Sequence, residues 1–99
     1  MQAKITYTFS AEIWQYGAPG GWYFISLPED LATEIRTHLK WQEEGWGRLK
    51  ATAKIGDTTW DTAIWFDTKK NTYILPLKAQ IRQQEKLKTG QKITAFIFL

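Results

Sequence analysis

Hydrophobic and polar side chains alternate from residue 4 to residue 13. One face of this segment carries Ile5, Tyr7, Phe9, Ala11 and Ile13, and the other carries Lys4, Thr6, Thr8, Ser10 and Glu12. A period of two is typical of a strand with one buried face. After a break rich in glycine, residues 22–27 (WYFISL) are apolar at almost every position. They predict a second, short strand that is covered on both faces.

A short amphipathic helix is predicted over residues 28–40. Pro28 suits the first turn of a helix, and the two acidic residues that follow it complement the positive end of the helix dipole. Leu31, Ile35 and Leu39 recur every four residues, which places them on one face. We expect that face to pack against the sheet.

The next segment predicts a β-hairpin. Residues 48–55 and the residues from 58 onward alternate on either side of a Gly-Asp pair that suits a two-residue turn. Residues directly opposite each other in such a hairpin share a face. This register places Trp60 opposite an alanine on the core side. Trp65 falls opposite Arg48 on the outward face, which also carries lysines.

Three further elements complete the predicted order β-β-α-β-β-β-α-β, in a single domain over residues 1–99. They are a short strand at 73–75, a second helix at 77–88 that begins after Pro76, and a final strand at 91–99. The final strand has large apolar residues on both faces: Ile93, Ile97 and Leu99 on one, Phe96 and Phe98 on the other. Both faces must be covered, either within the fold or by a second copy of the chain.

Four motifs stand out along the chain: GW-F--LP at 21–28, GWG at 45–47, A-IG-T-W-T at 53–62, and Y-LPLKA-IR at 73–82 with a glycine at 90. In this order they resemble the DUF1905 family of small domains, which has no established function. The resemblance covers essentially the whole chain. It implies a mainly β fold with two short helices, a small closed or double-split β-barrel. That implied fold is shared with transcription-factor-like and antitoxin DNA-binding domains.

Charge and composition narrow the function classes. Residues 1–47 hold three basic and six acidic side chains, whereas residues 48–99 hold ten basic and four acidic ones. A basic half attracts phosphates or acidic partners, although dispersed lysines also serve simply as a solvated surface. The chain has no cysteine, which excludes disulfides and thiolate chemistry and fits a cytoplasmic location. No apolar run approaches the roughly 20 residues of a membrane-spanning helix, so we expect no membrane association.

Signatures of catalysis are weak. His38 is the only histidine, and neither a nucleophile nor a set of metal ligands accompanies it at helical spacing. The glycine-rich segment at 16–21 lacks the lysine and hydroxyl residue of a phosphate-binding loop. We therefore expect a non-enzymatic binding or interaction module with no cofactor and no metal.

Aromatic and basic residues form the candidate ligand site. Trp22 follows a glycine pair and Trp46 lies between two glycines, so both are expected at a barrel mouth. Lys78 and Arg82 are four residues apart, on one face of the predicted second helix and close to its N-terminus. Such a mouth suits an anionic small ligand. The competing interpretation is that the tryptophans fill the barrel ends and the two cations are solvated.

Two alternative functions stay open. The outward face of the hairpin, with Arg48, Lys50, Lys54 and Trp65, suits nucleic acid, and such binding would weaken steeply with added salt. The apolar final strand suits self-association into a homo-oligomer instead.

Overall fold

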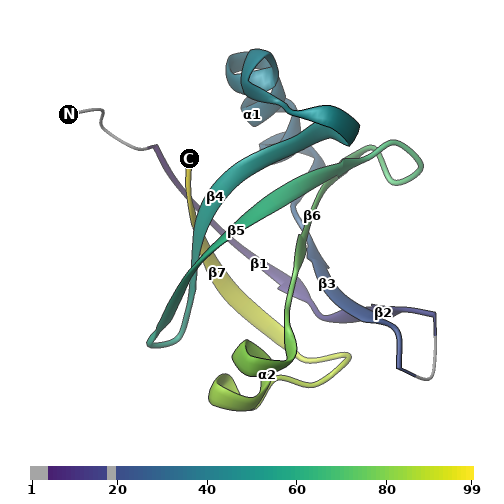
Figure 1. The fold of residues 1–99 in the computed structure, drawn as a ribbon, viewed down its shortest axis with the longest axis vertical. Helices are drawn as coiled ribbons and strands as arrows, with labels where there is room; N and C mark the ends of the chain where they lie inside the picture. The colour runs from purple at the N-terminus through teal and green to yellow at the C-terminus, as the bar shows by residue number, and fades with distance from the viewer. Residues whose placement is uncertain (1–4, 18–19) are drawn as a thin grey trace.

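The computed structural model describes residues 5–17 and 20–99 (Figure 1). The strands are β1 (Thr6–Glu12), β2 (Trp14–Tyr16), β3 (Trp22–Ser26), β4 (Arg48–Ile55), β5 (Thr58–Asp67), β6 (Thr72–Pro76) and β7 (Lys92–Phe98). The helices are α1 (Glu29–Leu39) and α2 (Ala79–Glu85), with single 3-10 turns η1 (Lys40–Gln42) and η2 (Gly45–Gly47). The expectation of a mainly β domain with two short helices is confirmed.

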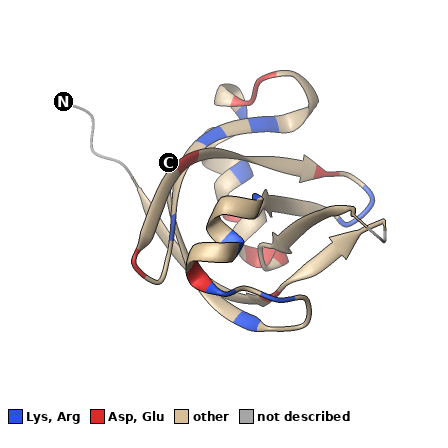
Figure 2. Cartoon of the chain, turned by 60° about the horizontal axis from the view of Figure 1, so that its bottom comes forward, with Lys and Arg blue, Asp and Glu red and all other residues tan. Residues whose placement is uncertain are grey.

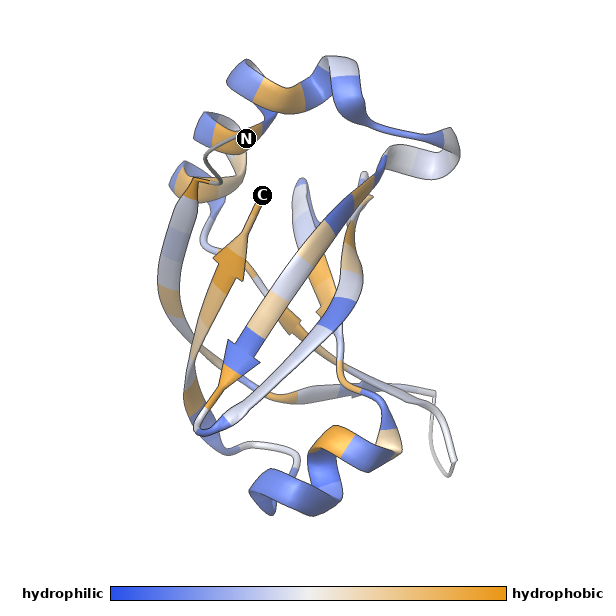
Figure 3. Ribbon diagram, turned by 60° about the vertical axis from the view of Figure 1, so that its left-hand side comes forward, coloured by the Kyte–Doolittle hydropathy of each residue, from blue (hydrophilic) through white to orange (hydrophobic). Residues whose placement is uncertain are grey.

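All the strands of the described residues join one antiparallel sheet in the order β1-β7-β4-β5-β6-β3-β2. The sheet curves into a half-barrel, with α1 at one end and α2 at the other (Figures 1 and 3). Its two edge strands, β1 and β2, are consecutive in the chain, but no ladder within the described ranges pairs one with the other. The closed barrel that the family resemblance implied is therefore not confirmed.

The predicted order lacked one strand, because β2 follows the first predicted strand (residues 4–13, of which residue 4 lies outside the described residues) directly after Ile13. This residue leaves the ladder: its N–H donates to the carbonyl of Gln91 at 3.0 Å, and its carbonyl accepts from Gly90 at 2.8 Å. Before it, β1 pairs with β7, and after it, β2 pairs with β3. The Ile13 side chain is only 1% exposed, so burial continues through the point where the chain changes partners.

The β4–β5 hairpin has the predicted register. Ile55 lies opposite Thr58 across a turn in which Gly56 has a φ of 57°, a left-handed value that glycine adopts without strain. Trp60 lies on the buried face, 8% exposed, and Trp65 lies opposite Arg48 on the outer face. Figure 3 shows the alternation of hydrophilic and hydrophobic residues along β4 that produces these two faces.

The first helix agrees with the prediction, and the second is shorter than the predicted range 77–88. It ends at Glu85 because Lys86 adopts a left-handed conformation with a φ of 56°. The chain then folds back, and the N–H of Leu87 donates to the carbonyl of Arg82 at 2.9 Å. Leu87 is thereby buried in the hydrophobic core, although it follows the helix.

The final strand β7 lies inside the sheet, between β1 and β4. Ile93 and Ile97 belong to the core of the chain itself. On the other face, Phe96 is 36% exposed and Phe98 is half-buried. The fold therefore covers one face of this strand fully and the other only in part, so the expectation that both faces are buried is not met within the described chain.

Candidate functional site

The structure does not bring together the four residues of the predicted ligand site. Trp22 is 69% exposed at the start of β3, near the α2 end of the sheet. Close by, the Arg82 guanidinium lies 3.8 Å from the centre of the Tyr23 ring. Lys78 is exposed and precedes α2, whereas Trp46 lies in η2, which packs on the opposite end of the sheet beside α1 (Figure 1).

Arg82 and Trp46 also differ in their burial and in their contacts. Arg82 donates from Nε to the carbonyl of Leu77 at 3.1 Å and is half-buried, so it holds α2 against β3. Trp46 has a φ of 67°, an uncommon value for a residue with a side chain, and its indole is 91% exposed. The structure therefore shows a packing role for Arg82 and a solvent-facing position for Trp46.

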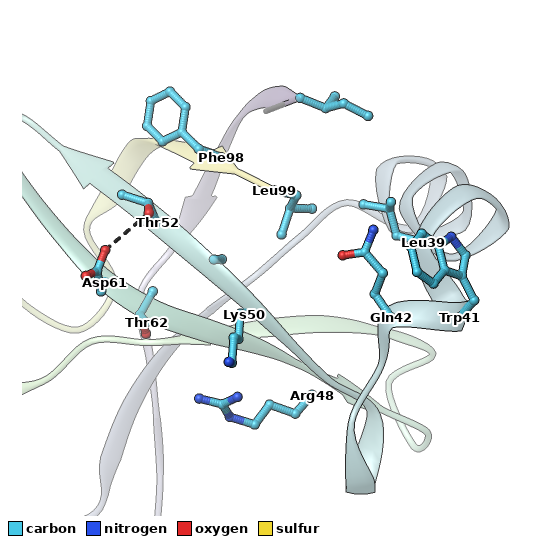
Figure 4. A pocket seen from close by; sticks show the side chains of 12 residues that line it. Leu39, Trp41, Gln42, Arg48, Lys50, Thr52, Asp61, Thr62, Phe98 and Leu99 are labelled. Atoms are coloured by element: carbon cyan, nitrogen blue, oxygen red, sulfur yellow. Dashed lines mark hydrogen bonds between the residues drawn. The ribbon is translucent and has the colours of Figure 1, made fainter. Parts of the chain in front are cut away.

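A groove of about 950 Å³ lies beside β4 at the α1 end of the sheet (Figure 4). Leu39, Trp41 and Gln42, which end α1 and form η1, line one side. Phe98 and Leu99 line another side, and β4 contributes Arg48, Lys50, Ala51 and Thr52. The groove thus combines apolar walls with basic side chains from the alternative, nucleic-acid set of predicted residues.

The groove exists because β4 is longer than its ladder with β7. That ladder runs only from Thr52 to Ile55 of β4. At the start of β4, Arg48 instead exchanges two backbone hydrogen bonds with Glu44, at 2.7 and 3.1 Å. Alternate residues of an antiparallel strand direct their backbone groups to the same side. The backbone N–H and carbonyl of Lys50 therefore point to the same side as those of Arg48 and Thr52, between Glu44 and β7. Within the described residues, no strand lies opposite Lys50 on that side.

The two basic residues of the groove have different electrostatic environments. Arg48 forms an ion pair with Glu44 at 2.6 Å, and its guanidinium lies 5.7 Å from the centre of the Trp65 ring. Lys50 is exposed and forms no ion pair in the part of the chain that the structure describes. Asp61 also lines the groove and accepts a hydrogen bond from Thr52 at 3.3 Å. Lys50 is therefore the cation in this groove with capacity for an anion.

A buried polar cluster holds the wall of the groove that follows α1. The Tyr73 hydroxyl donates a hydrogen bond to Glu43 Oε2, and Arg36 Nε donates to the same oxygen at 3.3 Å. The Arg36 guanidinium also stacks on the Phe66 ring, 3.8 Å from its centre. This cluster fixes the segment that carries Trp41 against strand β6.

Burial raises the pKa of Tyr73 far above its ordinary value, and the hydrogen bond to Glu43 and the negative charge of that carboxylate raise it further. The positive charge of Arg36 acts in the opposite direction. Tyr73 therefore remains a neutral hydrogen-bond donor at ordinary pH. The contact joins residues 30 positions apart, so the periodicity of the sequence gives no signal of it.

Some features of chemical sites do not occur in residues 5–17 and 20–99. No group of three or more His, Asp or Glu side chains there is arranged to hold a metal ion. No helix in these ranges is long and apolar enough to cross a membrane. His38 is exposed, and its backbone carbonyl accepts a hydrogen bond from Trp41 Nε1 at 3.1 Å.

The described residues define a small, mainly β domain with one curved antiparallel sheet, two short helices and a groove beside β4. The chain belongs to the DUF1905 family, whose members are described as a domain of unknown function. The family model matches residues 9–97, nearly the whole chain. The resemblance seen in the motifs is thereby confirmed. No curated protein matches the chain.

Proposed function

We propose that this domain is a non-enzymatic binding module whose groove beside β4 holds an anionic small ligand. The observation that carries the proposal is the position of Lys50, an exposed cation without an ion-pair partner among the described residues, in a groove of about 950 Å³. Binding pockets for small molecules typically measure about 300–1,000 Å³ and combine apolar walls with a few polar groups. This groove meets both criteria.

The walls give the ligand a second kind of contact. Trp41 is 80% exposed and Leu39 and Leu99 lie near it, so a ligand with an apolar part gains hydrophobic burial there. The backbone N–H of Lys50, which faces no strand of the described residues, adds a donor close to its ammonium group. An anion with a flat or apolar body, such as a nucleotide or an aromatic acid, fits these contacts better than a bare ion.

The class of function agrees with the expectation from the sequence, but the proposed residues differ. Lys50 replaces Lys78 and Arg82 as the cation, because Arg82 is engaged with α2 and β3 and neither Lys78 nor Arg82 lines the groove. We also keep the double-split barrel as a proposal, supported by edge strands that follow each other through Ile13. The cytoplasmic location and the homo-oligomer stay predictions, and light scattering tests the latter.

Isothermal titration calorimetry with inorganic phosphate, a nucleoside monophosphate and an aromatic carboxylate tests the proposal. Hydrogen bonds to charged groups contribute about 1.5–3 kcal/mol, so Lys50→Ala should weaken binding at least about tenfold. Lys54→Ala is the matched control, because Lys54 is exposed on the same face of β4 but does not line the groove. Absence of heat with all three compounds, or equal affinity in Lys50→Ala, would refute the proposal.

A further inference from the structure

The outer side of the sheet carries an aromatic face that is distinct from the groove. In the β2–β3 ladder, Trp14 lies opposite Phe24 and Tyr16 lies opposite Trp22. Directly opposed residues share one side of a sheet, and so do residues two positions apart in the same strand. All four rings therefore lie on the same side. Tyr16 is 70% exposed and Trp22 is 69% exposed. The Trp14 and Phe24 rings are half-buried against each other, with centroids 5.0 Å apart.

The ladder registers extend this face across the sheet. Phe24 lies opposite Pro76, and Ser26 lies opposite Ile74, which in turn lies opposite Trp65 of β5. Trp14 Nε1 donates to the Ser26 hydroxyl at 2.9 Å, which fixes the plane of its indole on this side. The residues of the other side, which alternate with these, form the core: Ile25, Ile64, Tyr73 and Leu75 are all 0% exposed. The aromatic face is therefore the solvent side of β2, β3, β6 and β5.

Basic side chains lie on and beside this face. Lys70 Nζ is 4.5 Å from the centre of the Trp14 ring, and the Arg48 guanidinium is 5.7 Å from that of Trp65. Figure 2 shows the basic segments of β4 and of the turn between β5 and β6. In that turn the Asp67 carboxylate accepts hydrogen bonds from the backbone N–H groups of Lys69 and Lys70, at 2.9 and 3.2 Å. Neither lysine forms an ion pair within the described residues.

We propose that this aromatic face binds single-stranded nucleic acid. Exposed rings on a sheet stack with unpaired bases irrespective of sequence, and lysine or arginine beside them meets the phosphates. Tyr16 and Trp22 provide the most accessible rings. Lys69 and Lys70, which form no ion pair within the described residues, provide the charges together with Arg48, whose charge is partly offset by Glu44. A duplex keeps its bases stacked inside, so it cannot use the rings. The positive charge at the borders favours a polyanion over an apolar protein partner.

Fluorescence anisotropy of labelled 12-nucleotide oligo-dT and oligo-rU, titrated with the full chain, tests the inference. A duplex of equal length is the reference ligand. The single strands should bind more tightly than the duplex, and binding should weaken with salt. For three phosphate contacts the dependence on salt predicts a loss of roughly twentyfold between 50 and 200 mM salt. No anisotropy change with either single strand at 50 mM salt would overturn the inference.

Variants at exposed positions leave the core intact and assign the binding to this face. Trp22→Ala should lower the affinity for oligo-dT at least about fivefold, the lower limit for loss of one stacked base. Trp46→Ala is the matched control, because this tryptophan is 91% exposed and belongs neither to the face nor to the groove. Lys70→Ala should make the salt dependence shallower, whereas Lys88→Ala, an exposed lysine beyond α2, should not.

Two results separate this inference from its competitors. Equal affinity of Trp22→Ala and the unchanged chain would overturn it. So would a dimer in light scattering that dissociates in Trp22→Ala, because the face would then bind a second copy. Neither Trp22 nor Lys70 lines the groove, so variants at these two positions do not test the groove. Binding of phosphate by the groove is tested independently with Lys50→Ala.

Discussion

Replacing Tyr73 with phenylalanine should destabilise the fold by removing one hydrogen bond. The Tyr73 hydroxyl donates to the carboxylate of Glu43, and no part of the Tyr73 residue is exposed. Phenylalanine retains the ring, which meets Phe66 edge-on with centroids 5.2 Å apart. The substitution therefore tests the hydroxyl without opening a large cavity.

The magnitude follows from the charge and burial of the acceptor. The Glu43 side chain is only 9% exposed, and without Tyr73 its carboxylate retains Arg36 as its remaining side-chain partner. A hydrogen bond to a charged group contributes about 1.5–3 kcal/mol. For a domain of this size each kcal/mol lowers the melting temperature by about 4–8 °C. We expect a loss of about 2 kcal/mol, or roughly 8–16 °C.

Urea unfolding followed by tryptophan fluorescence, together with calorimetry, measures this loss. Tyr16→Phe is the matched control, because it removes the same hydroxyl from a residue that is 70% exposed. The control should change the free energy of unfolding by no more than about 0.5 kcal/mol. If Tyr73→Phe melted within a degree of the unchanged chain, the role assigned to the buried cluster would be wrong.

The same variant should alter the stability at alkaline pH. Because the pKa of Tyr73 is raised in the folded state, the folded chain retains a proton that the unfolded chain releases above about pH 10. Stability then falls as the pH rises, by up to about 1.4 kcal/mol per pH unit for this group. Tyr73→Phe should make the fall shallower without abolishing it, because burial also raises the pKa of Tyr7. A slope identical to that of the unchanged chain would contradict the assignment.

Two further predictions concern packing. Trp60→Ala should lower the free energy of unfolding by about 3–5 kcal/mol, because the indole fills the core. Trp65→Ala on the outer face should lower it by only about 1–2 kcal/mol. Equal urea midpoints for the two variants would contradict the hairpin register. Gly47→Ala should lower the melting temperature, since a Cβ at its φ of 72° would lie 2.9 Å from that of Phe66, while Gly45→Ala meets open space and should be neutral. Equal melting temperatures of the two alanine variants would refute that steric argument.

The hairpin was predictable from local signals, and the site was not. The Gly-Asp turn and the alternation around it define which residue opposes which, and Trp60 and Trp65 lie on the two predicted faces. The predicted ligand site depended on which ends of strands and helices meet in space. Trp46 lies in η2 and Arg82 in α2, and nothing in their spacing along the chain indicates that these elements lie at opposite ends of the sheet.

The missed features are those produced by contacts distant in the sequence. Ile13 continues the alternating pattern, and its exit from the ladder depends on backbone partners near residue 90. The groove depends on where the ladder between β4 and β7 begins. The aromatic face requires the registers of several strand pairs at once. Periodicity predicts the face on which a side chain lies, whereas these features require knowledge of strand order.

The pairing of β1 with β7 has a consequence for how the chain folds. Thr6 lies opposite Phe98, so this ladder joins residues at nearly the two extremes of the described chain. Closing so long a loop costs conformational entropy before the contacts of the ladder offset it. Domains rich in contacts between residues distant in the sequence therefore fold slowly. During synthesis, β1 must wait for β7 to leave the ribosome before it has a partner. Until then its apolar face is available to chaperones.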